Sequence, residues 1–176
     1  SIHMIDLVIW ILGVKPISVY AIGNKIGSNT TDLKKFVNHN SIRSILKKSR
    51  KVTNLPIFIK LPRLLEIEYY DELIKATQEF DQVGVVLCNT LPVTDSRLSV
   101  GNGGRSGKSL FDSTLSILKY VRKSFPEITI LCSGGISSPD QAKMLLESGA
   151  NALQIYTALI YEGPGIIKEI NDSLSN

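Results

Sequence analysis

The residues best suited to chemistry lie in two loops near the carboxyl end of the chain. The glycine pair Gly134 and Gly135 follows one apolar run, and Tyr156 and Thr157 follow the next. Adjacent glycines let the backbone approach a ligand closely. Ser138 is the expected N-cap of a helix whose N-terminus directs unpaired N–H groups and a positive dipole end toward an anion. Together, the two loops predict a site that holds a phosphate group.

Three further polar residues stand at the ends of two other apolar runs. Lys60 closes the run 56–60, and Asn89 and Thr90 follow the run 83–88. Burying an ammonium without a partner is costly, so an anionic partner or ligand is expected near Lys60. Asn89 and Thr90, taken alone, fit a simple strand-to-loop cap. In a barrel, they would point into its mouth.

A second glycine-rich segment spans 101–108 and ends in Gly107 and Lys108. It does not match a P-loop, because the gap of four residues between the glycines and a Gly-Lys-Ser/Thr ending is absent in register. Two interpretations stay open. The segment is either a mobile loop with Arg105 and Lys108 as cationic tips, or a flexible surface loop without a ligand.

Short apolar runs alternate with helical patterns along the chain. Buried parallel strands are predicted at 17–22, 56–60, 83–88, 128–132 and 152–156. Helices are predicted at 41–50, 69–80, 113–124, 138–148 and 165–174. This alternation predicts an α/β fold, either an open doubly wound sheet or a partial (β/α)8 TIM barrel. Phosphate-type loops after the last two strands favour the barrel, of which the chain supplies about five βα units.

The bulk composition predicts one globular core in a chain of 176 residues, of which 43% are hydrophobic. The formal net charge is +4, and the one dense basic cluster lies within 47–51. No aromatic residues interleave with that cluster, so a solvated helix face explains it better than nucleic acid. The apolar run 5–14 is shorter than the roughly 20 residues of a membrane span, and neither a transmembrane helix nor a signal peptide is expected.

Cysteine and histidine usage argues against a disulfide or a metal site. Cys88 and Cys132 each end an apolar run, which predicts buried free thiols in a reducing compartment. His3 and His39 have no carboxylate or cysteine at ligand spacing, so no metal is expected. An intracellular, cytoplasmic location is the corresponding expectation.

Several of these segments occur together, and in the same order, in a known family. From about Thr30 to Asn171 the chain resembles the C-terminal part of dihydroorotate dehydrogenase, an FMN-dependent (β/α)8 barrel. The Ser-Gly-Lys-Ser-Leu form at 106–110 is most similar to the quinone-linked, membrane-associated class. The matching segments are Phe58–Leu61, Leu87–Thr90, Gly103–Leu110, Cys132–Ser138 and Leu153–Leu159.

The resemblance implies a role for each candidate site residue. It implies an FMN cofactor, dihydroorotate or orotate as the small-molecule ligand, and a place in pyrimidine biosynthesis. Lys60 would contact the flavin and Gly107 would lie against FMN. The FMN phosphate would be bound by Gly134, Gly135, Tyr156 and Thr157, and the substrate by Asn24, Asn29, Thr30, Asn89 and Thr90.

The chain departs from the family at the catalytic base. The family places a Ser or Cys there to remove the C5 proton of dihydroorotate, whereas Gly27 falls in register in this chain. Glycine has no side chain that accepts a proton, so the base is missing even if flavin and orotate bind. Ser28 is not expected to replace it, because its side-chain direction would differ.

The first residues resemble a different family. His3 and Asp6 belong to a segment, about 1–23, that is similar to the glucose-fructose oxidoreductase and inositol dehydrogenase family, although no dinucleotide fingerprint follows. The sequence therefore predicts an N-terminal helix-strand segment at 1–30, as a junction or chimaeric part. The C-terminal part of an FMN-binding barrel follows at 31–176.

The leading hypothesis is FMN-dependent oxidation of dihydroorotate to orotate, with weak FMN binding and little or no turnover in this chain. One alternative is a non-catalytic module that binds a phosphate ligand or assembles as a homo-oligomer through exposed strand edges. The other is a fragment of an NAD(P)-dependent sugar oxidoreductase. None of these three hypotheses involves a nucleic acid or a transmembrane segment.

Overall fold

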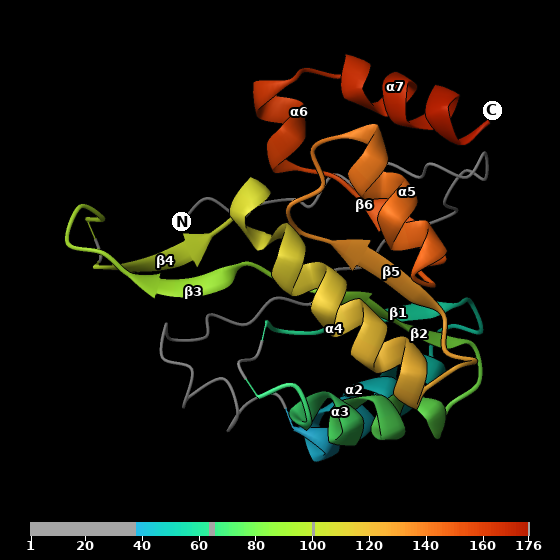
Figure 1. Cartoon of the computed structure of the whole chain (residues 1–176). Coiled ribbons are helices and arrows are strands. Elements are labelled where there is room, and N and C mark those ends of the chain that lie inside the picture. Colours follow the sequence, from blue (N-terminus) through green and yellow to red (C-terminus); the bar gives the residue numbers. More distant parts are fainter. Residues whose placement is uncertain (1–37, 64–65, 100, 176) are drawn as a thin grey trace.

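The fold is built on a parallel sheet of four strands (Figure 1). The structure is a computed structural model that describes residues 38–63, 66–99 and 101–175. The strands are β1 (Ile57–Lys60), β2 (Val83–Leu87), β5 (Ile130–Ser133) and β6 (Ala152–Gln154), in the order β1-β2-β5-β6. Each strand pairs in parallel with the next, which confirms the predicted α/β class.

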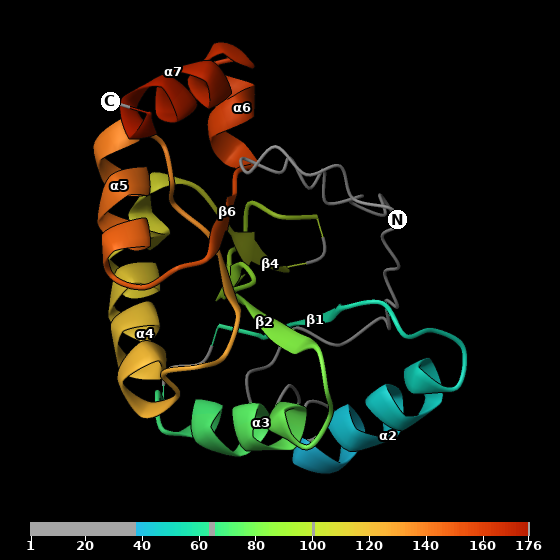
Figure 2. The ribbon, with the colours of Figure 1, turned by 90° about the vertical axis from the view of Figure 1, so that its right-hand side faces the viewer.

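Each pair of neighbouring strands is joined by a helix. The connecting helices are α3 (Tyr69–Gln78), α4 (Phe111–Ser124) and α5 (Pro139–Glu147). Figure 2 shows that these helices line the outer side of the curved sheet. The helix α2 (His39–Arg50) lies against α3, where Arg43 donates two hydrogen bonds from Nε, of 2.9 and 2.7 Å, to the carboxylate of Glu79.

Two helices follow the last strand. They are α6 (Thr157–Tyr161) and α7 (Gly165–Leu174), and α7 packs against α5 through the buried side chains of Ile166 and Ile170. The predicted bounds of α7 agree with the structure. The sequence did not predict α6, because its five residues are too few for a helical period to be recognised.

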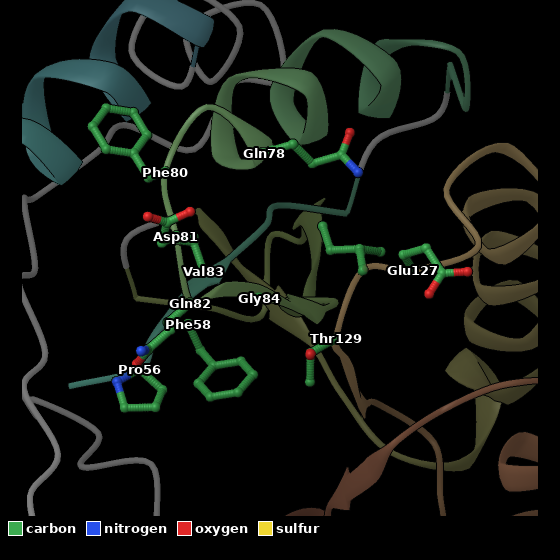
Figure 3. A pocket seen from close by; sticks show the side chains of 11 residues that line it. Pro56, Phe58, Gln78, Phe80, Asp81, Gln82, Val83, Gly84, Glu127 and Thr129 are labelled. Atoms are coloured by element: carbon green, nitrogen blue, oxygen red, sulfur yellow. The ribbon is translucent and has the colours of Figure 1, made fainter. Parts of the chain in front are cut away.

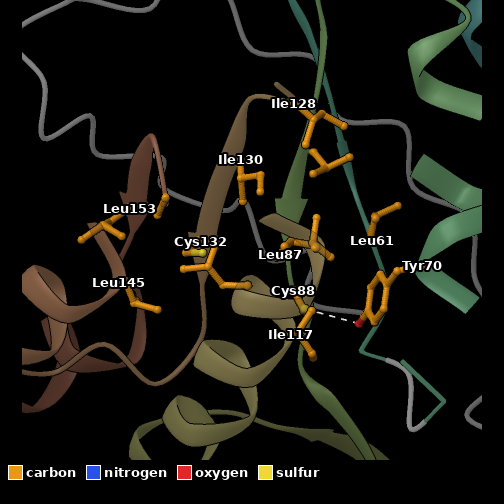
Figure 4. Close-up of a cluster of buried hydrophobic side chains, with 14 of the residues drawn as sticks. Leu61, Tyr70, Leu87, Cys88, Ile117, Ile128, Ile130, Cys132, Leu145 and Leu153 are labelled. Atoms are coloured by element: carbon orange, nitrogen blue, oxygen red, sulfur yellow. Dashed lines mark hydrogen bonds between the residues drawn. The ribbon is translucent and has the colours of Figure 1, made fainter. Parts of the chain in front are cut away.

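Apolar residues on alternate strand positions form the core between the sheet and its helices. Val85, Leu87, Ile130 and Cys132 face this side and are buried with Leu118 of α4. Figure 4 shows this cluster, in which the Tyr70 hydroxyl lies 3.4 Å from Cys88 Sγ. Both cysteines are buried and free, as the sequence predicts.

The opposite side of the sheet carries a smaller apolar cluster. Val86, Leu131 and Ala152 are buried there, and Phe58 packs against them. Apolar side chains on both sides explain why the strands appear in the sequence as continuous apolar runs. The same arrangement is expected of strands in a (β/α)8 barrel, whose inner side is filled by side chains.

An antiparallel hairpin projects from the main sheet (Figure 1). Its strands are β3 (Leu91–Thr94) and β4 (Asn102–Arg105), and Leu91 pairs with Arg105 at its base. A short 3-10 helix, η1 (Lys108–Leu110), connects the hairpin to α4. The prediction of a loop throughout 101–108 is therefore wrong for residues 102–105, which form a strand because the opposite strand pairs with their backbone.

Some predictions fall on residues outside the described ranges. These are the strand at 17–22, the helix-strand segment 1–30 and the boundary between residues 30 and 31, all of which stay predictions. In the part of the chain that is described, no helix combines the length and the apolar character needed to cross a membrane.

Candidate ligand-binding site

The candidate residues meet at one edge of the parallel sheet. Because all four strands run in the same direction, their carboxyl ends lie at the same edge. Lys60 ends β1 and lies opposite Val86, and Ser133 at the end of β5 lies opposite Gln154 of β6. The loops after β1, β2, β5 and β6 therefore all begin on one side of the molecule.

The glycine turn after β5, Gly134 and Gly135, has a backbone that only glycine adopts readily. The φ angles are +116° at Gly134 and +85° at Gly135. A Cβ atom on Gly135 would lie 2.3 Å from the backbone nitrogen of Phe111. The turn is thus held directly against the start of α4, and its conformation is fixed by both φ and close contact.

The helix after this turn begins as the sequence predicts. Ser138 is the N-cap of α5, with its Oγ accepting a hydrogen bond from the Gln141 N–H at 3.3 Å, and Pro139 is the first helical residue. Gly149, with φ of +103°, follows the helix at the expected stop. The Ser138 cap thus pairs one N–H group of the first helical turn, and the Ser137 N–H just before the helix donates to Gln141 Oε1 at 2.8 Å.

The loop after β6 meets the segment that follows the hairpin. The Thr157 hydroxyl donates a hydrogen bond of 3.1 Å to Ser106 Oγ. Gly107 has φ of +90°, and a Cβ atom there would lie 3.3 Å from the Thr157 methyl group. Tyr156, at the start of α6, is 39% exposed. The structure therefore brings three candidate residues, Gly107, Tyr156 and Thr157, into one region.

The loop after β2 is anchored to the loop after β1. The Asn89 N–H donates to the Leu61 carbonyl at 3.0 Å, and Asn89 Oδ1 accepts a hydrogen bond of 2.8 Å from the Thr90 N–H. Thr90 packs against the hairpin, since a Cβ atom on Gly104 would lie 2.3 Å from its Oγ1. Lys60 is half-buried at the end of β1.

A buried arginine that sequence reasoning missed lies behind these loops. Arg63 is 3% exposed, and its Nε donates to the Asn89 carbonyl at 3.2 Å. Its Nη1 donates to Ser113 Oγ at 2.7 Å and its Nη2 to Thr114 Oγ1 at 2.8 Å. An arginine just after a strand normally indicates a solvated loop, and nothing local in the sequence distinguishes this one.

The charge of Arg63 acts on both buried thiols. Burial raises the pKa of Cys88, while the charges of Arg63 and Lys60 and the hydrogen bond between Cys88 and Tyr70 partly oppose that shift. Burial and the neighbouring Cys88 also raise the pKa of Cys132, while the charges of Arg122 and Arg63 act in the opposite direction. These thiols stay protonated at neutral pH, so neither is a nucleophile.

The cavity in Figure 3 lies at the other edge of the sheet. Its volume is about 610 Å³, and its lining includes Pro56, which precedes β1, Val83 at the start of β2 and Thr129, which precedes β5. These positions mark the amino ends of the strands. The cavity is therefore separate from the candidate residues, and none of them lines it.

Four predicted residues lie outside the described ranges. They are the proposed substrate contacts Asn24, Asn29 and Thr30, together with Gly27 at the base position. Their roles stay predictions. The described candidates Lys60, Asn89, Thr90, Gly107, Gly134, Gly135, Tyr156 and Thr157 all belong to loops or strand ends at the carboxyl edge.

Parallel strands joined by outer helices, with a glycine turn at the carboxyl edge, define part of a (β/α)8 barrel. Solved structures of DHODH from Eimeria tenella have the same fold. One, in complex with ferulenol, gives a TM-score of 0.68 at 24% identity over 83% of this chain and 46% of that chain. The ligand-free form gives 0.70 at 22% identity over 85% of this chain and 48% of that chain.

The family is shown by sequence. A family model described as "Dihydroorotate dehydrogenase" matches residues 8–176, and the chain belongs to the dihydroorotate dehydrogenase family. Dihydroorotate dehydrogenase (quinone) from Nitratiruptor sp. is 32% identical over 160 residues, covering 90% of this chain and 46% of the relative. The enzyme with the same description from Nautilia profundicola is 32% identical over 171 residues, covering 96% of this chain and 48% of the relative.

These relatives confirm the resemblance to the quinone-linked class. The chain spans about half the length of each of them.

Proposed function

We propose that this chain carries the phosphate end of an FMN site of the kind that oxidises dihydroorotate to orotate in pyrimidine biosynthesis, and that this oxidation is impaired or absent in the chain itself. The observation that carries this proposal is the glycine turn at Gly134 and Gly135, which lies at the same sheet edge as the Thr157–Ser106 contact. Membership of the family supports the same conclusion, and the match from residue 8 onward favours it over the two alternatives.

The described residues fit an FMN phosphate. No hydrogen bond within the described ranges uses the N–H groups of Gly134, Gly135, Tyr156 or Thr157. A phosphate dianion is stabilised by several backbone N–H donors and by a nearby positive charge, and buried Arg63 supplies such a charge. The missing Cβ atoms of the glycine pair let that backbone approach a ligand closely.

Each group at the edge has a distinct task in the proposed site. The glycine turn and the Tyr156–Thr157 loop bind the phosphate, and Gly107 leaves space beside them. Lys60 offers an ammonium to the flavin, and the amide of Asn89 and the hydroxyl of Thr90 orient the substrate. When bound, FMN supplies the acceptor for the two electrons that leave dihydroorotate.

Proton removal is the step that this chain is not equipped to perform. The family base position holds Gly27, which has no group that accepts the C5 proton. We therefore propose FMN binding without measurable turnover for this chain. The quinone-linked relatives make a quinone the proposed electron acceptor of the whole protein.

Titration of the purified chain with FMN and with riboflavin tests the proposal. Flavin fluorescence reports binding, and riboflavin serves as the matched ligand because it lacks only the phosphate. We expect FMN to bind at least about tenfold more tightly, a difference of about 1.4 kcal/mol. Equal dissociation constants, or no binding of either flavin, would contradict a phosphate site.

A second measurement separates binding from turnover. Dihydroorotate is added to the FMN-loaded chain with an electron-accepting dye, and dye reduction is followed by absorbance. We expect no reduction above the rate of a denatured control. A measurable rate would show that another residue removes the C5 proton.

A further inference from the structure

Arg63 is a charged residue buried in the fold, and packing alone does not explain why a charge lies there. Its guanidinium is buried where the loops after β1 and β2 meet the first turn of α4, and it is 3% exposed. The acceptors it contacts are the Asn89 carbonyl and the hydroxyls of Ser113 and Thr114. All three are neutral, and within residues 38–63, 66–99 and 101–175 Arg63 has no ion-pair partner.

When all partners of a buried cation are neutral, no neighbouring anion neutralises its charge, and its electric field acts on other groups nearby. Water screens charges at the surface, but a guanidinium in a low-dielectric interior acts over a longer distance. Its charge opposes the raised pKa of two thiols on neighbouring strands, Cys88 after β2 and Cys132 on β5.

Arg63 lies directly behind the glycine turn. A Cβ atom on Gly134 would lie 2.7 Å from Arg63 Nη2, so the guanidinium fills the space that a side chain would need. Thr114 connects the two as well. Its Oγ1 accepts from Arg63 and lies 2.9 Å from the Gly134 carbonyl and 3.0 Å from the Leu110 carbonyl, either of which can accept its proton.

We propose that Arg63 is a positioning residue that places a positive charge behind the Gly134 turn and thereby selects a dianionic phosphate. Arg63 acts through the turn, without contacting the ligand. The inference rests on the proposed function, because it assumes that a phosphate binds at this turn. Arginine suits the place because its planar fork reaches three acceptors at once, in the loop after β2 and on α4.

The ratio of the riboflavin and FMN dissociation constants measures selection for the phosphate. Arg63→Met removes the charge and keeps an unbranched apolar side chain. A positive charge about 10 Å from one negative charge, at an effective dielectric of about 20, corresponds to roughly a tenfold change, and the second charge of the phosphate adds to it, so we expect the ratio to fall at least about tenfold. Riboflavin binding should change by less than about threefold. Arg63→Lys restores the charge and should return the ratio to within about threefold of the unchanged chain.

Arg122→Met is the matched control, because Arg122 also ties α4 to neighbouring loops, but at the amino edge of the sheet. It should lower stability and leave the ratio unchanged. If Arg63→Met keeps the full ratio, or if Arg63→Lys loses as much as Arg63→Met, the charge of Arg63 does not select the phosphate. If the unchanged chain itself has a ratio near one, the proposed function fails instead, which distinguishes the two outcomes.

A second pair of variants tests the inference if Arg63→Met does not fold. Ser113 is exposed near the start of α4, so Ser113→Asp adds a carboxylate beside Arg63 Nη1 at a position that helices tolerate. Ser116→Asp adds the same charge one turn further along, where the side chain contacts the Asp112 carbonyl and not Arg63. Ser113→Asp should lower the ratio of the riboflavin and FMN dissociation constants at least about threefold more than Ser116→Asp. Equal ratios in the two variants would overturn the inference.

Discussion

At the scale of single residues, backbone conformation matters as much as side-chain chemistry. Gly135 is the clearest case, because it combines φ of +85° with a Cβ position only 2.3 Å from a backbone nitrogen of α4. Neither the turn nor the start of α4 can move without disturbing the other. The glycine that faces the proposed ligand therefore also determines how closely β5 and α4 approach.

We predict that Gly135→Ala destabilises the fold strongly. The added methyl group would overlap the Phe111 backbone, and the expected loss is about 3 kcal/mol or more in the free energy of unfolding. Gly163→Ala is the matched control, since Gly163 has φ of +73° but no atom within 4 Å of a Cβ, and should lose about 1 kcal/mol. Urea unfolding of both variants provides the comparison. If the two variants lost similar amounts of unfolding free energy, the positive φ angle, and not the contact with Phe111, would account for the destabilisation.

The buried thiols predict a pH dependence of stability. The pKa values of Cys88 and Cys132 are raised above the ordinary value of 9.0 by burial. Below that pH the thiols are protonated in both the folded and the unfolded chain. Above it the unfolded chain releases these protons while the folded chain keeps them, so stability falls as pH rises, by at most about 1.4 kcal/mol per pH unit for each thiol.

Urea unfolding between pH 8 and 10.5 measures this slope. The double variant C88A/C132A, which removes both titrating groups, should have a shallower slope whatever its absolute stability. If the two slopes agree, the thiols do not contribute to the alkaline loss of stability.

At the scale of elements, α4 connects the two edges of the sheet. Its first turn contacts Arg63 at the carboxyl edge, and near its end Arg122 donates to the carbonyls of Gly149 at 2.7 Å and Ile128 at 2.9 Å. Arg122 Nη2 also donates to Asn151 Oδ1 at 3.0 Å. These contacts join the loops before β5 and β6.

We predict that Arg122→Met costs about 2 kcal/mol in the free energy of unfolding, because several partly buried carbonyls lose their donor. Lys119→Met, an exposed position on the same helix, is the control and should change stability by less than about 0.5 kcal/mol. Thermal unfolding followed by circular dichroism measures both. An equally small loss for Arg122→Met would mean that water replaces its hydrogen bonds.

The sequence predicts the elements that depend on local pattern. The predicted ends of four strands and five helices within the described ranges lie within two residues of those observed, although the residues of β1 are only partly buried. The strand Asn102–Arg105 was missed because glycines have low strand propensity and pairing with Leu91–Thr94 determines its conformation. Arg63 was missed because its burial comes from Ser113 and Thr114, some fifty residues away in the chain.

At the scale of the whole molecule, the described sheet is a segment of a barrel wall. β1 and β6 are its outer strands, and within the described ranges each pairs on one side only. The chain spans about half the length of its quinone-linked relatives, which agrees with a wall of this extent. The candidate phosphate loops lie on this half, so the phosphate proposal can be tested on the chain as it is.

Arg63 lies at the carboxyl edge of the sheet and Arg122 at the amino edge. The residues that face the proposed ligand and those that support the fold can therefore diverge separately during evolution. Arg122 and its carbonyl acceptors support the fold at the amino edge, whereas the glycine turn and its neighbours at the carboxyl edge face the proposed ligand. Exposed loop positions beside the ligand can vary without disturbing the supports at the far edge. A lineage can therefore lose or exchange its chemistry while inheriting the same scaffold.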